Sequence, residues 1–475
     1  MNYQPYSLKD VYESSKRKRF TCISTFAGGG GSSTGYKLAG GDVRGVLEFQ
    51  QIGIDTYLEN YRDTPKICED IKNVTGSDVL ELIDMKVGDL DILDGSPPCP
   101  PFSMSGSKRK GWNQTKVVYG FEQSNIEDLS FELARMVHVV RPKVFICENV
   151  KGMTMDYAHD HFQTIMDAFS DSNSPYWEHY KWKDDKKEQG WVENSKYEIS
   201  WRILNAKDYG VAQGRQRVFI VGIRDDIYGK DNLSPREQFD IYGEFSSRRS
   251  IDNSTLKYIW PHPVTREVNF TLRDAIEDLI DDEDNKQEGM KIIDIMKKQK
   301  RWEHLKNMPI DVDKETGFVE LATTIYNEKM KEHSRLTEND PNFNEPMHTW
   351  KHKKTGEIRH DDVSYMGKEW ENLSFVRGSG WQVRRVSWDK PSHTLTERGL
   401  QTGTSAHIHP QYPRGFTPKE AMRIMSLPDD YHLEGGSDDN MDKKLARIGL
   451  MVAPRQMEHL ARSVYEQVIR KYNNA

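Results

Sequence analysis

A glycine-rich turn between an apolar strand and a helix restricts the fold of this chain more than any other segment. Residues 20–25 have the apolar composition of a buried strand, glycines follow at residues 28–31, and a helical pattern begins near Tyr36. A strand, a glycine turn and a helix in this order are typical of nucleotide sites in doubly wound α/β proteins. The turn lacks the Lys-Ser/Thr ending of a P-loop, so we do not expect a bound triphosphate. A simple hinge is the alternative interpretation.

An acidic residue follows the turn at a distance typical of dinucleotide sites. Glu48 lies near the end of the apolar run of residues 43–49, about twenty residues beyond the glycines, where a carboxylate can accept hydrogen bonds from ribose hydroxyls. Asp70 and Ile71 follow a short helical segment and are candidates for the adenine side, although an ordinary surface turn explains them equally well. Together these residues indicate an adenosine-bearing cofactor.

The composition predicts a soluble, intracellular protein. The chain has 475 residues and 36% hydrophobic content, which suffices for two or three domains with substantial cores. No apolar run reaches membrane-spanning length, and the N-terminal residues lack the apolar centre of a secretory signal. Widely spaced cysteines without a CxxC pair predict free thiols and no metal site. The net charge of −7 means that a nucleic acid would have to meet a local basic surface.

One of the cysteines, Cys99, lies in a loop that prolines stiffen. Prolines precede and follow it within residues 94–103, and proline fixes φ and withholds a backbone donor. We interpret Cys99 as a nucleophile, with a small buried hydrophobic residue as the alternative. The polar segment 104–125 carries Lys108 and other basic residues, and we expect it to form a lid over a phosphate backbone. A solvated loop is the alternative.

A carboxylate and two arginines are predicted to face the same crevice as Cys99. Residues 144–147 have the pattern of a buried strand that ends in residues 148–150, and the carboxyl ends of parallel strands meet at one edge of a sheet. Residues 197–204 and 217–223 have the pattern of an antiparallel pair, with Arg215 and Arg217 alternating onto one face. With Gln213 they can orient a carboxylate or bind an anion. A salt-bridged structural glutamate and an exposed edge strand are the alternatives.

We predict four segments along the chain. These are a polar N-terminal extension at residues 1–19, a catalytic domain at 20–224, a smaller domain at 225–400 and a C-terminal segment at 401–475 that returns to the catalytic domain. Charge rises and apolar periodicity fades after residue 225. In the last segment, Thr417, Pro418 and Glu420 predict a capped helix that ends at Pro428, and residues 457–469 carry the apolar stripe of a core helix.

Taken in order, these motifs resemble those of the cytosine-C5 DNA methyltransferases. The matching stretches are residues 26–28 with the glycines that follow, 98–99, 148–150, 213–217, 391–396, 416–428 and 448–449. The resemblance covers roughly residues 20–224 and 381–470. It implies a doubly wound, Rossmann-like, S-adenosylmethionine-dependent methyltransferase fold with a smaller target recognition domain. Three residues differ from those common in the family, namely Ser24 in place of an acid, Pro100 in place of Gln and Leu450 in place of Asn.

The resemblance also implies roles for individual residues. S-adenosyl-L-methionine would be bound by the glycine turn, the ends of the next strands and the proline loop, at Phe26, Ala27, Gly28, Gly30, Gly31, Glu48, Phe49, Asp70, Ile71 and Pro98. The Cys99 thiolate would add to C6 of a cytosine flipped out of the duplex, and Glu148 would hold N3 and the exocyclic amine. Arg217 and Arg215 would orient Glu148. The implied DNA contacts are Ser103, Ser105, Lys108, Gln213 and Arg377.

Double-stranded DNA is the partner that the resemblance implies, bound by a monomer, with or without a cognate restriction endonuclease in the same host. A tRNA cytosine-C5 methyltransferase would use the same chemistry, but the long region 225–380 favours DNA. A catalytically silent DNA-binding relative is the other alternative, and Pro100 and Leu450 prompt it. The intact set of Cys99, Glu148 and Arg217 argues against it.

Overall fold

The computed structural model describes most of the chain, in two compact units. It covers residues 3–98, 116–118, 121–123, 129–180, 190–228, 259–264, 269–298, 318–320, 349–352, 354–360, 370–372, 384–397, 407–433 and 440–474. Unit 1 comprises Met1–Phe270, Met422–Asp439 and Leu450–Ala475, and unit 2 comprises Thr271–Ala421 and Asn440–Gly449. The chain passes between the units within helices α13 (Pro418–Ile424) and α14 (Met441–Leu450).

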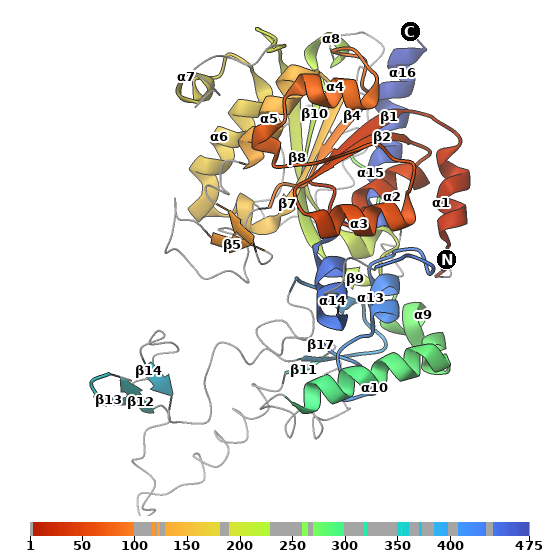
Figure 1. The fold of residues 1–475 in the computed structure, drawn as a ribbon, viewed down its shortest axis with the longest axis vertical. Helices are drawn as coiled ribbons and strands as arrows, with labels where there is room; N and C mark the ends of the chain where they lie inside the picture. The colour runs from red at the N-terminus through yellow and green to blue at the C-terminus, as the bar shows by residue number, and fades with distance from the viewer. Residues whose placement is uncertain are drawn as a thin grey trace, which may run out of the picture. The chain divides into compact units, whose positions relative to one another are not determined.

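Unit 1 is built on a seven-stranded sheet of described residues with the strand order β3-β2-β1-β4-β7-β10-β8 (Figure 1). The strands are β1 (Thr21–Thr25), β2 (Asp42–Glu48), β3 (Lys66–Cys68), β4 (Ile92–Gly95), β7 (Val144–Val150), β8 (Tyr197–Asn205) and β10 (Gln216–Arg224). Strands β3, β2, β1, β4 and β7 are parallel, and β10 runs antiparallel to both β7 and β8. The predicted α/β class and the predicted antiparallel pair are confirmed. The strand order reverses direction between β1 and β4, where doubly wound sheets bind their ligands.

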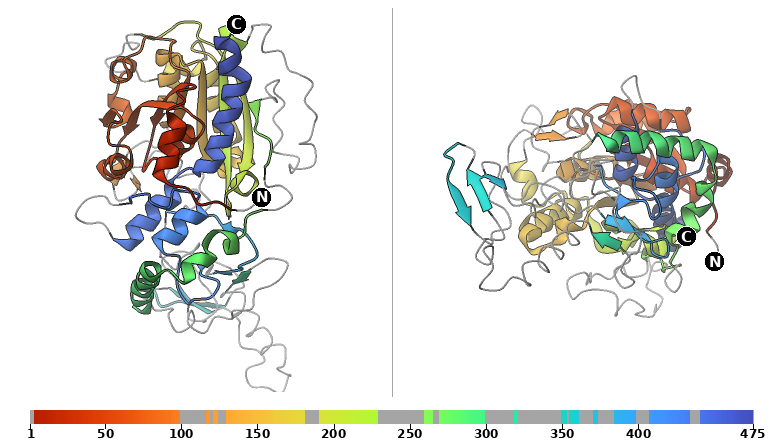
Figure 2. Two further views of the ribbon diagram at one scale, coloured as in Figure 1. Left: turned by 90° about the vertical axis from the view of Figure 1, so that its right-hand side faces the viewer. Right: turned by 90° about the horizontal axis from the view of Figure 1, so that it is seen from below.

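Helices cover both faces of this sheet because neighbouring residues of each strand point to opposite sides. One core contains Ile23, Leu93 and Phe145 with residues of α5 (Leu129–Val140) and α6 (His159–Ser170). The other contains Cys22 and Ile146 with residues of α2 (Gly31–Leu38) and α15 (Pro454–Val464). Figure 2 shows the C-terminal helices in dark blue along one side of the sheet. The predicted apolar stripe at 457–469 is confirmed as part of this core.

The remaining elements of unit 1 are short. The helices are α1 (Leu8–Ser15), α3 (Gln51–Asn60), η1 (Ile71–Asn73), α4 (Gly76–Ile83), η4 (Lys151–Thr154), η5 (Asp156–Ala158), α7 (Tyr176–His179), η7 (Ala206–Tyr209), α8 (Asp225–Tyr228), η11 (Tyr465–Ile469) and α16 (Arg470–Asn473). The short strands are β5 (Lys116–Val118), β6 (Phe121–Gln123) and β9 (Gln213–Gly214), of which β5 and β6 form an antiparallel pair.

Two details differ from the sequence-based predictions. The apolar run at residues 90–93 predicts a strand before the proline loop, but strand β4 begins at Ile92, because Leu90 already packs in the core outside the ladder. Strand β7 ends at Val150, as the sequence predicted, and Glu148 lies near its carboxyl end. Asp70 follows strand β3, whose three residues were not predicted, and not a helix.

Unit 2 contains a long helix and small sheets among its described residues. Its elements are α9 (Leu272–Ile276), η10 (Glu277–Ile280), α10 (Glu283–Lys297), β11 (Phe318–Glu320), β12 (Thr349–His352), β13 (Ile358–His360), β14 (Trp370–Asn372), β15 (Arg384–Val386), β16 (Ser392–His393) and β17 (His407–Ile408). Two three-stranded sheets have the orders β11-β15-β17 and β13-β12-β14.

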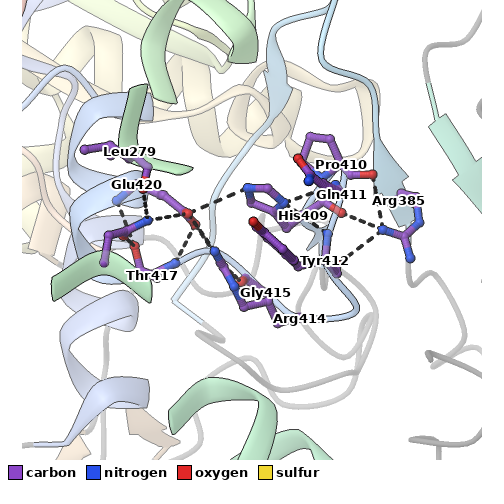
Figure 3. A network of polar contacts seen from close by, with 11 residues as sticks. Leu279, Arg385, His409, Pro410, Gln411, Tyr412, Arg414, Gly415, Thr417 and Glu420 are labelled. Atoms are coloured by element: carbon purple, nitrogen blue, oxygen red, sulfur yellow. Dashed lines mark hydrogen bonds and ion pairs between the residues drawn. The ribbon is translucent and has the colours of Figure 1, made fainter. Parts of the chain in front are cut away.

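A buried polar network organises the start of α13 (Figure 3). Arg414 donates two hydrogen bonds of 2.8 Å to the carboxylate of Glu420, and Arg385 donates to the carbonyl oxygen of His409 at 2.8 Å. The predicted capping box is confirmed, because the Thr417 amide donates to Glu420 and the Glu420 amide donates to the Thr417 hydroxyl. Burial lowers the pKa of His409 to about 3, so this side chain is neutral at physiological pH.

Candidate active site

The glycine turn connects β1 to α2 in left-handed backbone conformations. Phe26, Gly28 and Gly30 have φ angles of +55°, +51° and +94°. A Cβ atom on Gly28 would meet nothing within 4 Å, so glycine is favoured there by its positive φ angle and not by close contacts, and the space beside it is open. A Cβ atom on Gly31 would lie 2.4 Å from the carbonyl oxygen of Val452. Gly28 therefore has room for a ligand beside it, whereas Gly31 permits close packing of α2.

The buried carboxylate of Glu48 holds this turn against the end of β2. It accepts hydrogen bonds from the backbone amides of Gly28 at 2.7 Å and Gln50 at 2.8 Å. Burial raises the pKa of Glu48, and the amide donors act in the opposite direction. The Phe49 amide also donates to this carboxylate. A carboxylate has about four acceptor positions, so Glu48 retains acceptor capacity for a ribose hydroxyl.

The other predicted cofactor residues lie at the same edge of the sheet with different exposure. Phe49 follows Glu48 and is 39% exposed. Asp70 caps η1 by accepting a backbone hydrogen bond of 3.1 Å, and Pro98 is half-buried. The side chains of Ala27 and Ile71 are buried in the two cores, so these residues can offer a ligand little beyond backbone groups.

The loop that leads to Cys99 is fixed by residues that the sequence did not single out. The side-chain amide of Asn149 donates to the carbonyl oxygen of Pro97 at 3.1 Å, which ties this loop to β7. Asp94 on β4 is fully buried, and burial raises its pKa to about 6. Its acidic side chain beside the proline loop was the only available signal. Five predicted residues lie outside the part of the chain that the structure describes, namely Cys99, Ser103, Ser105, Lys108 and Arg377.

Glu148 and two arginines come together as predicted. The Arg217 Nε atom lies 3.2 Å from Oε1 of Glu148, whose residue is 7% exposed. Burial raises the pKa of Glu148, while the positive charges of Arg217 and Arg215 act to lower it. Antiparallel pairing causes this meeting, because it places Arg217 opposite Val150, two residues from Glu148. The group therefore combines a buried carboxyl, whose pKa is raised, with the positive charges of two arginines.

Arg215 and Gln213 have buried positions that differ from that of Arg217. Arg215 is 2% exposed and donates to the carbonyl oxygen of Met451 at 3.0 Å. The Gln213 side chain is fully buried and its amide lies 3.4 Å from the sulfur of Met425. These two residues thus connect the start of β10 to the C-terminal part of unit 1, and Arg217 is the more exposed of the two arginines near Glu148.

Neither a metal cluster nor a membrane span accompanies this site in the described residues. No group of three or more His, Cys, Asp or Glu side chains there could hold a metal ion. Within the same residues, every helix is too short or too polar to cross a membrane.

Comparison with known proteins identifies extensive similarity. The family model for C-5 cytosine-specific DNA methylases matches residues 20–466. The type II methyltransferase M.Sau96I of Staphylococcus aureus is 27% identical over 427 residues, which cover 90% of this chain and 72% of that protein. The type II methyltransferase M.AquIA of Picosynechococcus is 31% identical over 54% of this chain and 96% of its own length. A solved structure assigned as a prophage-encoded DNA modification methyltransferase (E. coli) superposes with a TM-score of 0.50 at 17% identity, covering 95% of this chain and 99% of that one.

Proposed function

Because the chain belongs to the family of C-5 cytosine-specific DNA methylases, we propose that it transfers a methyl group from S-adenosyl-L-methionine to C5 of a cytosine in double-stranded DNA. The observation that carries the proposal is the cluster of Glu148, Arg217 and Arg215 at the carboxyl ends of the strands. Strand β4 lies between that cluster and β1, whose glycine turn is held by Glu48. The part of the site proposed for the cytosine and the part proposed for the cofactor thus lie at the same edge of the sheet.

The residues around the glycine turn fit an adenosine-bearing cofactor. The space beside Gly28 is open, and Glu48 presents acceptor positions for ribose hydroxyls. Phe49 is partly exposed next to them and offers an aromatic face to a base. When bound, S-adenosyl-L-methionine supplies an electrophilic methyl group on its sulfonium. We assign its binding to Phe26, Gly28, Glu48, Phe49, Asp70 and Pro98.

The nucleophile of the proposed reaction is Cys99. C5 of cytosine is too weak a nucleophile to take the methyl group directly, so the thiolate adds to C6 and leaves the ring electron-rich at C5. After transfer, a base removes the proton from C5 and the thiol leaves. Because these ring atoms are stacked within a duplex, the cytosine must first be flipped out of the helix.

Glu148 supplies the proton that this addition requires. Its pKa is raised by burial, so the carboxyl can hold a proton nearer neutrality than an exposed glutamate does. It can donate this proton to N3 of the cytosine as negative charge develops on the ring. Arg217 fixes the orientation of the carboxyl through the contact of 3.2 Å between its Nε atom and Oε1. The positive charges of Arg217 and Arg215 also keep the proton from being held too tightly.

Sequence selection is assigned to the region 225–400, between the two parts of the catalytic domain. The relatives are named type II methyltransferases, and this supports a restriction-modification setting with a cognate endonuclease as partner. We propose that the enzyme acts on DNA as a monomer.

A methyl-transfer assay on purified protein tests the proposal. Radiolabelled methyl groups from S-adenosyl-L-methionine should enter duplex DNA and not tRNA. Glu148→Gln should lower the rate by on the order of a hundredfold or more, and Cys99→Ala should abolish it. Glu59→Gln, a matched change of an exposed glutamate, should leave the rate unchanged. Incorporation into tRNA alone would favour the tRNA enzyme, and incorporation into neither would favour a silent relative.

A further inference from the structure

A buried carboxylate on β4 accepts hydrogen bonds from residues of β1 and α2, the two elements that the glycine turn connects. Asp94 on β4 is fully buried and accepts hydrogen bonds from the hydroxyls of Ser24 and Ser32 at 2.8 Å each. A third hydroxyl, that of Tyr36, donates to its other oxygen at 3.0 Å. The donors come from β1 and from α2, so they flank the glycine turn on both sides.

The register of the sheet places this carboxylate directly beside β1. Ser24 and Asp94 are Cα partners on adjacent parallel strands, and the Thr25 hydroxyl donates to the Asp94 carbonyl oxygen at 2.8 Å. A Cβ atom on Gly95 would lie 2.5 Å from a methyl carbon of Leu133, so the end of β4 is tightly packed. A shift of the turn relative to β4 would break these hydrogen bonds, and Asp94 therefore couples the two segments.

The position of Asp94 also couples it to Glu148. Asp94 is the Cα partner of Ile146 on β7, and Glu148 lies two residues further along the same face. The titratable groups that act on the charge of Asp94 are Cys22 on β1, Tyr36 on α2 and Glu148 on β7. Its three side-chain donors are neutral hydroxyls.

Among the residues that the structure describes, the side chain of Asp94 accepts hydrogen bonds from neutral hydroxyls alone. Such a buried carboxylate is energetically unfavourable at a purely structural position. Burial of an ionised group is unfavourable, and here it raises the pKa of Asp94 to about 6. A neutral side chain of similar shape would fill the same space without this penalty. Buried ionisable groups beside a reaction site are candidates for a functional role.

We infer that Asp94 is a positioning residue of the transfer reaction, which uses its charge and its three hydroxyl donors to hold the glycine turn, the segment assigned to the cofactor, in register with β4. The inference rests on the proposed function. It predicts a defect in cofactor use when the charge is lost, because the turn is then held less firmly. DNA binding should be affected little.

The experiment compares wild-type protein with Asp94→Asn and with the exchanged pair Ser24→Asp/Asp94→Ser. Asp63→Asn, at an exposed aspartate, is the matched control. KM for S-adenosyl-L-methionine, kcat and KM for DNA are measured from about pH 5 to about pH 8, together with melting temperatures. Asp94→Asn should raise KM for the cofactor about tenfold or more near neutral pH, while KM for DNA changes less than twofold.

The pH dependence separates positioning from simple stabilisation. In wild-type protein, KM for the cofactor should rise as pH falls through about 6 and Asp94 becomes protonated, whereas Asp94→Asn should lack this rise. The exchanged pair should recover part of the affinity, because it returns a carboxylate to the neighbouring position. If Asp94→Asn does not fold, Ser32→Ala must show the increase in KM instead.

Two outcomes overturn the inference in distinguishable ways. An Asp94→Asn enzyme that is folded and has an unchanged KM for the cofactor at all pH values overturns it and leaves the proposed function standing. A wild-type protein that transfers no methyl group to DNA overturns the proposed function, and the inference with it.

Discussion

Replacing Asp94 by asparagine is expected to stabilise the protein more at high pH than at low pH, relative to wild type. The pKa of Asp94 is raised from 3.8 to about 6 by burial. Since the folded protein then binds its proton more tightly than the unfolded chain does, stability falls as pH rises through this window. One pKa unit corresponds to about 1.4 kcal/mol, so the ionised group lowers the free energy of unfolding by roughly 3 kcal/mol above the folded-state pKa.

About half of this effect lies in a range where the protein can be handled. Between about pH 5 and about pH 8 the difference in unfolding free energy between Asp94→Asn and wild type should grow by ~1.4 kcal/mol. That corresponds to roughly 3 °C in melting temperature for a domain of this size. A fixed packing cost of the amide would appear at both pH values and does not change the expected trend.

Thermal unfolding of both proteins across this pH range is the assay. Asp63→Asn, at an exposed aspartate, is the matched control. A difference for Asp94→Asn that stays constant with pH, or that shrinks as pH rises, would refute the reasoning. Either result would mean that the folded protein accommodates the ionised carboxylate without the penalty of burial.

Three further substitutions test the site and the two units. Gly31→Ala should cost roughly 1–3 kcal/mol in chemical denaturation, because a Cβ atom there would lie 2.4 Å from a backbone oxygen. Arg217→Ala should raise the pKa of Glu148 by removing the positive charge that contacts it. The pH–rate profile should therefore move to higher pH, and Arg217→Lys, which keeps the charge, should move it less. Glu420→Gln leaves the buried Arg414 without its charged partner and should lower unfolding free energy by about 3–5 kcal/mol, detectable as a lower melting temperature.

Local sequence patterns located the strands that carry the site. The apolar runs before Glu48 and Glu148 predicted strands β2 and β7, and the structure confirms both. The apolar residues between 129 and 140 recur at helical spacing and Pro142 predicts the end of that helix; α5 ends at Val140 with Arg141 in a left-handed conformation. Such signals are reliable where burial on both faces forces a continuous apolar strand or where proline excludes a helix.

Elements without an apolar run were missed. Strand β3 has three residues, too few for alternation to be visible, and its pairing with β2 decides its existence. Helix α10 begins in the acidic stretch that was interpreted only as a loss of periodicity. Asp282 caps this helix by accepting a hydrogen bond of 2.8 Å from the Asn285 amide. Acidic residues in a first helical turn are stabilising, so the charge run itself was a helix signal.

The network around Asp94 could not be predicted without the strand order. Its donors Ser24, Ser32 and Tyr36 lie 70, 62 and 58 residues away along the chain. Only the pairing of β1 with β4 brings them together. The same holds for Asn149 and Pro97, which meet because β4 pairs with β7.

Base-resolution bisulfite sequencing of DNA from cells that express the protein tests the central claim most directly. Wild-type protein should protect one cytosine within one short sequence motif from conversion, and cells without the protein should show no protection at that motif. Cys99→Ala, with folding verified by its melting temperature, should lose the protection completely. Full protection by Cys99→Ala, or no protected motif with folded wild-type protein, would contradict the assignment.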